Sequence, residues 1–180
     1  MPFHYYQRLS APEQAIYRRS DELHVVKLPN YLALRPIVPE LGAALEQGDR
    51  RLVQVLAARL VDGITAGFDL PGTTVEVLEI RPKDRRAELH GLYTVSADGR
   101  ARISVWMRTA EHGRVVAFRT FLRTLLHEVC HHLDVALLDL APSFHTAGFY
   151  RRESSLFHQL VPEAARAYAR APYLRRSPAS

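Results

Sequence analysis

The segment from Arg114 to Leu138 contains neither proline nor glycine, and its apolar residues recur at helical spacing. On a helix that turns about 100° per residue, these side chains gather on one face, which has to pack against other parts of the chain. They are Val115, Phe118, Phe121, Leu122, Leu125, Leu126, Val129 and Leu133. The sequence therefore predicts a long helix with one buried face, around which the remaining elements must be arranged.

Residues 127–131 of this helix read His-Glu-Val-Cys-His, an HExxH motif. His127 and His131 are one helical turn apart, so both imidazoles project to the same side, opposite the apolar face. A bare pair of histidines at this spacing is compatible with an ordinary surface pair. Glu128 beside them, on a well-anchored helix, favours a site in which two imidazoles bind a metal ion and a carboxylate acts on water.

A catalytic zinc ion usually has three protein ligands, and the sequence offers two candidates for the third. His145 follows the helix break at residues 139–142 and is expected in the first turn of a second helix, over residues 143–160. Glu153 lies two turns further along that helix. The positive end of a helix disfavours imidazolium, and a metal binds neutral imidazole, so His145 is the preferred candidate.

Three further polar residues could support such a site. Asp134, one turn after His131, could accept a hydrogen bond from the ring N–H of a ligand imidazole, although an ordinary polar helix residue fits equally well. Tyr150 and Arg152 are candidates for stabilising an oxyanion formed on a substrate carbonyl. For Arg152 a surface position is the competing interpretation.

Two residues inside the motif region are assigned other positions. Cys130 points between the metal face and the apolar face, and a buried free cysteine usually behaves as a small hydrophobe, so core packing is expected. His132 points about 100° away from His131 and is expected at the surface or behind a ligand.

Together with its neighbours, the motif resembles the compact zincin metallopeptidases, in particular the SprT-like, WLM and YgjP-like group and the minigluzincins. The similar stretch covers roughly residues 88–160. It includes Gly91-Leu92-Tyr93, Ile103-Ser104-Val105, the approach to the motif from Arg123, and His145 followed by Gly148-Phe149. Cys130 departs from the alanine or glycine that often precedes the second histidine, and the first eighty residues resemble no family.

The resemblance implies a zinc metallopeptidase with His127, His131 and His145 as ligands and Glu128 as general base, acting on a peptide or protein. A gluzincin-type site would instead use Glu153 as the third ligand. Metal-activated water would attack the peptide carbonyl, and Glu128 would pass its proton to the leaving amine.

A non-catalytic or regulatory zinc module that acts through DNA or protein binding is the alternative function. Structural zinc sites have four protein ligands, and the fourth would come from Glu153, Asp134 or His132. An association with DNA is implied only by the resemblance to SprT-like proteins, because the basic residues are not interleaved with aromatic residues as in a single-strand binding surface.

Composition favours a single cytoplasmic globular domain. The chain has 180 residues, of which 47% are hydrophobic and 24% charged, with a formal net charge of +5. No apolar run approaches the roughly 20 residues that cross a bilayer. A single cysteine and the lack of a signal-peptide pattern at the start fit a reducing compartment.

The expected fold class is α+β and zincin-like, with one domain over residues 1–180. Residues 1–70 are predicted to be helical, with helices over 10–25, 39–47 and 49–67 and a loop or extended segment over 28–36. Residues 71–160 should contain a small antiparallel sheet of about three strands, over 74–80, 87–95 and 100–107, followed by the two metal-binding helices. The strand Arg102–Arg108, with Trp106, is expected at the sheet edge, where an extended peptide could add as a further strand. Residues 172–180 are predicted to be a flexible tail.

Overall fold

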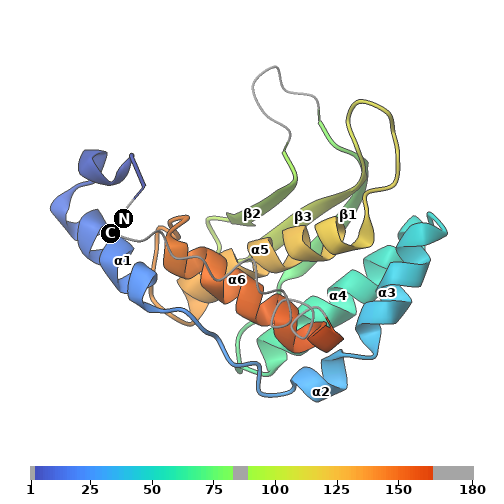
Figure 1. Cartoon of the computed structure of the whole chain (residues 1–180), viewed down its shortest axis with the longest axis horizontal. Coiled ribbons are helices and arrows are strands. Elements are labelled where there is room, and N and C mark those ends of the chain that lie inside the picture. The colour runs from blue at the N-terminus through green and yellow to red at the C-terminus, as the bar shows by residue number, and fades with distance from the viewer. Residues whose placement is uncertain (1–2, 83–88, 164–180) are drawn as a thin grey trace, which may run out of the picture.

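The chain folds into a mixed α+β structure (Figure 1). The computed structural model describes residues 3–82 and 89–163. The tail predicted over residues 172–180 and the first residues of the predicted second strand lie outside the described residues. Where the predicted helices and strands fall on described residues, each has a counterpart within a few residues of its expected position.

The N-terminal region is helical, as predicted. A 3-10 turn, η1 (Tyr6–Arg8), precedes α1 (Ala11–Glu22). α1 begins with a capping box, in which the Glu13 carboxylate accepts the backbone N–H of Ser10 and the Ser10 side chain pairs with the backbone of Glu13. This arrangement satisfies backbone donors that would otherwise be unpaired in the first turn. α1 has only two buried residues, Tyr17 and Ser20, so it lies on the outside of the molecule.

The segment predicted as a loop contains a short helix, α2 (Tyr31–Leu34). Its Leu34 side chain is buried, and the Asn30 amide donates a hydrogen bond to the carbonyl of Gly63 on a later helix. The loop prediction was therefore wrong over these four residues, because tertiary contacts stabilise a turn that proline-flanked sequence alone does not favour.

Two longer helices follow, α3 (Ile37–Glu46) and α4 (Arg50–Ala66). Asp49 caps the second helix, since its carboxylate accepts the backbone N–H of Leu52. This bond satisfies one of the free N–H groups of the first turn. The apolar stripe of α4 is buried at Val53, Leu56, Leu60 and Ile64.

The sheet has three strands, β1 (Thr74–Ile80), β2 (Gly91–Val95) and β3 (Ala101–Arg108), in the order β1-β3-β2. β2 and β3 pair antiparallel, as predicted, but β1 pairs with β3 in parallel, from Thr74 opposite Arg102 to Ile80 opposite Arg108. The prediction of an antiparallel sheet was wrong in this respect. The segment between Ile80 and Ala101 contains β2, which runs in the opposite direction to β3. The chain is therefore back at the end of the sheet where β1 started, and β3 runs parallel to β1.

The strand predicted to be the free edge, β3, is the central strand. It is hydrogen-bonded on both sides, and Trp106 is buried at 7% exposure. An added peptide strand therefore cannot pair there. Of the three described strands, β2 is the outer strand that carries residues near the HExxH helix.

The HExxH helix is α5 (Phe118–Ala136), and α6 (Ala147–Leu160) packs against it. α5 begins four residues later than predicted. Val115 instead forms a β-bridge with Arg108, and the Val116 N–H bonds the carbonyl of Met107, so the chain stays extended there.

The hydrophobic core lies between the sheet and the helices. α4 packs on β1, and α5 packs on β2 and β3, so the two helices cover one face of the sheet (Figure 1). α1 lies to one side next to α6 (Figure 1). Within residues 3–82 and 89–163, no helix combines the length and the apolar character needed to cross a lipid bilayer.

The burial of α4 generates a stability prediction. Leu60 is fully buried, so Leu60→Ala should lower the free energy of unfolding by about 2–5 kcal/mol through lost burial and a residual cavity. Val55, on the same helix and 60% exposed, is the control, and Val55→Ala should change it by less than about 0.5 kcal/mol. Urea denaturation followed by circular dichroism measures both, and equal losses would contradict this arrangement of α4.

Candidate metal centre

α5 places the two motif histidines as the sequence predicted. Its apolar face is buried at Phe121, Leu122, Leu125, Leu126, Val129 and Leu133. His127 and His131 are half-buried on another side of the helix. The ten buried residues of this helix fix its position, so the two imidazoles project from a rigid base.

His145 lies just outside α6. Thr146 is the N-cap residue, and its hydroxyl accepts the backbone N–H of Phe149. The prediction placed His145 within the first turn, and it is displaced because threonine, a preferred N-cap residue, occupies the next position. His145 is therefore exposed and held by a non-helical segment.

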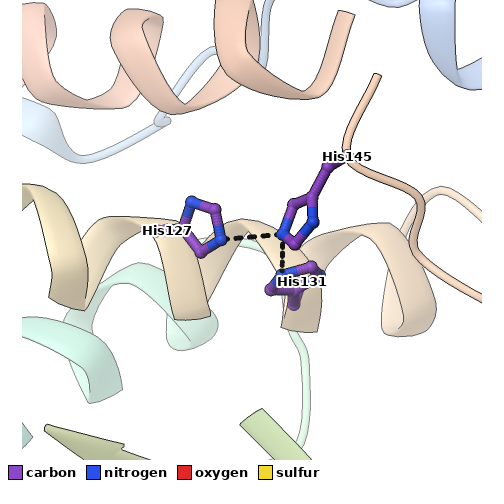
Figure 2. A group of neighbouring side chains, drawn as sticks. All are labelled: His127, His131 and His145. Atoms are coloured by element: carbon purple, nitrogen blue, oxygen red, sulfur yellow. Dashed lines mark hydrogen bonds between the residues drawn. The ribbon is translucent and has the colours of Figure 1, made fainter. Parts of the chain in front are cut away.

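The three imidazoles converge on one point (Figure 2). The Nε2 atom of His145 lies 2.9 Å from Nε2 of His127 and 3.0 Å from Nε2 of His131. Zinc–nitrogen bonds of about 2.0–2.1 Å in tetrahedral geometry would place such atoms about 3.3 Å apart, so a small outward shift accommodates an ion. Among the described residues, these three histidines lie close enough to hold a metal ion.

The protonation state of the cluster suits metal binding. Burial, with the neighbouring imidazoles of His127 and His145, lowers the pKa of His131 to about 3. Burial and His127 also lower the pKa of His145. Both rings are therefore neutral near pH 7, which is the form that binds a metal ion.

A hydrogen-bonded chain lies behind His131. The Ser143 hydroxyl is 2.8 Å from Nδ1 of His131 and donates to Oδ2 of Asp134 at 2.8 Å. Since that hydroxyl proton is directed at the carboxylate, the hydroxyl oxygen accepts from Nδ1–H. The tautomer this selects leaves the Nε2 lone pair of His131 free to face the cluster.

Arg152 completes this chain from α6. Its Nε and Nη2 atoms bond the two carboxylate oxygens of Asp134 at 3.1 and 2.9 Å, and both side chains are fully buried. Burial raises the pKa of Asp134, while Arg152 and Ser143 oppose that rise. Three donors point at the carboxyl group of Asp134, so its oxygens act only as acceptors. The group is therefore in the carboxylate form.

This arrangement corrects two predictions. Asp134 supports His131 through the Ser143 hydroxyl rather than by direct contact. Arg152 cannot contact a substrate oxyanion, because its guanidinium is buried and bonded to Asp134 and to the carbonyl and hydroxyl of Ser20. A surface position for Arg152 is equally excluded.

Glu153 lies behind His127 rather than among the converging nitrogens. One carboxylate oxygen accepts from Arg123 at 2.8 Å, and the other is 3.8 Å from Nδ1 of His127. The Nε2 atom of His127 faces His145 instead. The geometry therefore favours His145 over Glu153 as the third ligand.

Glu128 is buried against the start of β2. A Cβ atom at Gly91 would lie 2.4 Å from Oε1 of Glu128, so a larger residue there would displace this carboxylate. Burial raises the pKa of Glu128 to about 7, although the charge of His127 and a hydrogen bond from the backbone of Tyr93 lower it. A carboxyl group with a pKa near neutrality can both accept and return a proton.

Cys130 and His132 lie away from the converging nitrogens. The Cys130 thiol is 1% exposed, and burial raises its pKa, which confirms the prediction of core packing. His132 is also buried, so a surface position was wrong. Its Nδ1 atom lies 3.2 Å from the hydroxyl of Tyr93, whose ring stacks on His131.

Tyr150 lies beside the histidine cluster, against His127 and His145. Its ring stacks on that of His145 with 5.9 Å between centroids, and it is 42% exposed. Of the two oxyanion candidates, only Tyr150 has the accessibility that contact with a substrate requires.

Two hollows adjoin the centre, and both are lined in part by Gly91, His127 and Glu128. One has a volume of about 360 Å³ and extends along β2 to His131 and His145. The other, of about 440 Å³, extends toward Arg123 and Glu153. Together they provide space beside the outer strand, next to both the histidines and Glu128.

Gly91 and Ser143 were not assigned to the site from the sequence, although both line the hollow beside the three histidines. A glycine within a predicted strand does signal close approach of another group, so Gly91 was detectable in principle. Ser143 offered no signal, because its contacts depend on how the segment between α5 and α6 folds back.

No protein-family model, curated protein or solved structure matches this chain. The class of site is therefore defined by its own geometry: three converging imidazoles, an adjacent buried carboxylate and open space beside them.

The chain behind His131 predicts an effect on metal affinity. Ser143→Ala removes the group that orients the His131 ring, and loss of such a partner typically weakens metal binding by about 10–100-fold. Ser96→Ala, on the exposed turn between β2 and β3, is the control and should bind zinc as the original chain does. Competition with a chromophoric chelator measures both affinities, and unchanged affinity in Ser143→Ala would contradict this role.

Proposed function

We propose that this protein is a zinc-dependent metallopeptidase with a zincin-like fold. The observation that carries the proposal is the convergence of the His127, His131 and His145 Nε2 atoms beside the buried carboxylate of Glu128. Three histidine ligands are a set found in catalytic zinc sites, and the neighbouring carboxylate is free to act on water.

Zinc fits these donors better than harder cations do. Imidazole nitrogen suits zinc and other late transition metals, whereas magnesium and calcium prefer oxygen ligands. Bound at these nitrogens, zinc would supply Lewis-acid activation of a water molecule and of a substrate carbonyl.

Glu128 is the proposed general base. Its carboxylate is held between α5 and the Gly91 backbone, where burial has brought its pKa close to neutrality. It would take a proton from the attacking water and return it to the leaving amine, which requires a group that changes protonation state easily at pH 7. Tyr150 is proposed to donate its phenolic proton in a hydrogen bond to the oxyanion.

The proposed substrate is a peptide bound in extended form along β2. Of the described strands, β2 pairs with β3 alone, and the hollow that reaches the three histidines runs along Gly91, Leu92 and Tyr93. A peptide that adds as a strand there forms main-chain hydrogen bonds and brings a carbonyl next to Glu128. This replaces the earlier expectation for β3.

The alternative, a closed zinc module, requires a fourth protein ligand, and the three candidates are engaged elsewhere. Asp134 bonds Arg152 and Ser143, His132 lies against Tyr93, and Glu153 bonds Arg123. Their positions support an open coordination position and therefore favour the enzyme.

Two substitutions separate metal binding from hydrolysis. Glu128→Gln keeps the shape of the side chain but removes the base, so it should retain zinc and lose hydrolysis by at least about 100-fold. His131→Ala should lose the metal itself. Zinc content by mass spectrometry and cleavage of a quenched-fluorescent peptide library measure the two effects. Full hydrolysis by Glu128→Gln would contradict the proposed role of Glu128 as base.

Gly91→Ala tests the placement of Glu128 from the other side. The added methyl group would collide with the Glu128 carboxylate, so hydrolysis should fall by about 10–100-fold while zinc affinity changes little. Gly72→Ala is the matched control, because no atom lies within 4 Å of the added carbon. Peptide cleavage at equal zinc occupancy is the measurement. Equal activity in the two variants would show that Gly91 does not position the base.

A further inference from the structure

We propose that the N-terminal brace, residues Phe3–Glu22, positions His145 and thereby sets the metal affinity of the centre. The proposal rests on the metal site proposed above. It gives a function to a region that resembles no known family. Residues more than one hundred positions from His145 in the sequence would then belong to the metal site.

His145 needs support from outside its own element. His127 and His131 project from a 19-residue helix, but His145 precedes the N-cap of α6 and is exposed. A ligand in a non-helical segment is free to move unless other parts of the chain hold its backbone. The position of its Nε2 atom therefore depends on what contacts residues 139–146.

The first part of the brace contacts this segment directly. The Tyr5 hydroxyl donates a hydrogen bond to the backbone carbonyl of His145 at 3.0 Å. The rings of Tyr5 and Tyr17 both lie against Phe144, with centroids 6.5 and 6.2 Å from its ring. Phe144 and His145 are thus held in place by two tyrosines of the brace.

α1 holds the residues on either side of His145. The Ser20 hydroxyl bonds the buried Thr146 hydroxyl at 3.1 Å, and the Asp21 carboxylate accepts the Gly148 N–H at 3.0 Å. At the other end of the segment, the Arg19 guanidinium donates to the carbonyls of Leu138 and Asp139. The segment that carries the third ligand is therefore fixed at both ends by one helix.

Gly148 permits this close approach. A Cβ atom at this position would lie 2.1 Å from the Ser20 carbonyl oxygen and 2.8 Å from Cα of Asp21. Both are backbone atoms of α1, so the collision cannot be relieved by rotating a side chain. Gly148 lies in the first turn of α6, where alanine favours the helix itself, so a substitution there acts on the position of α1.

The brace is separate from the hydrophobic core. Within the described residues, the core cluster begins at Val26 and includes no residue of the brace. Figure 1 shows α1 beside α6 and away from the sheet. A variant that displaces the brace should therefore leave this apolar cluster intact while it changes the position of His145 and of Ser20, which bonds Arg152.

The decisive variant is Gly148→Ala, measured by Zn²⁺ affinity in competition with a chelator. We expect affinity to fall by about 10–100-fold, the usual effect of losing the groups that orient a ligand. The matched control is Gly42→Ala in α3, where the added carbon would lie 3.4 Å from the Phe118 ring, an ordinary contact. It should bind Zn²⁺ as the original chain does. Equal affinity in both variants would overturn the proposal.

Two adjacent tyrosines provide a milder test that does not disturb packing. Tyr5→Phe removes the hydrogen bond to His145 and should weaken Zn²⁺ binding about threefold to tenfold. Tyr6→Phe removes a hydroxyl that bonds Arg18 within the brace and should leave the affinity unchanged. This pair decides the question if Gly148→Ala fails to fold, and equal affinities would overturn the proposal.

A third measurement separates positioning of the ligand from general destabilisation. In a His145→Ala background, Tyr5→Phe should cause no further loss of affinity, because the Tyr5 hydroxyl acts on the backbone of residue 145. The visible spectrum of Co²⁺ bound to Tyr5→Phe should shift toward that of His145→Ala. Additive losses would indicate a structural effect and overturn the proposal. If the original chain binds no Zn²⁺, both the metal site and the brace fail, whereas tight binding that is insensitive to these variants removes the brace alone.

Discussion

The ion pair between Asp134 and Arg152 holds the site together. Both side chains are fully inaccessible to water, and burying either charge alone would cost several kcal/mol, so each requires the other. The remaining donors of Arg152 bond Ser20 and the carbonyl of Leu23, and Asp134 also accepts the Ser143 hydroxyl. One buried pair thus connects α5, α6, α1 and the segment that carries His145. This explains why a site with few residues depends on three distant parts of the chain.

The parts of the fold that the sequence could predict are those encoded by local patterns. The apolar spacing on α5 places the two motif histidines correctly, and Asp49 caps α4 as its residue type suggests. Chain direction in the sheet is not local, because β1 can pair with either side of the hairpin without any change in its own alternation. The same applies to α2, where burial of Leu34 stabilises a turn that proline on both sides disfavours.

At the candidate site, the limit of prediction is the environment of each side chain. The identities of His127, Glu128 and His131 follow from spacing on one helix. For Arg152 the sequence left open a contact with a substrate oxyanion and a surface position, but the carboxylate of Asp134 and the Ser20 carbonyl bind its guanidinium in the interior. Helical periodicity gives a direction, and only the neighbouring elements decide whether that direction leads to solvent or to a buried partner.

The capping box of α1 acquires a meaning when the order of synthesis is considered. Ser20 and Thr146 are 126 residues apart, so α1 leaves the ribosome long before the surface it packs on exists. A 12-residue helix in isolation is marginal in water, and the Ser10–Glu13 cap is a local means of favouring it without tertiary contacts. Only Tyr17 and Ser20 of α1 are buried in the folded chain, so α1 exposes little apolar surface before α6 has been synthesised. α1 is made well before the surface it packs on, and its sequence is suited to that delay.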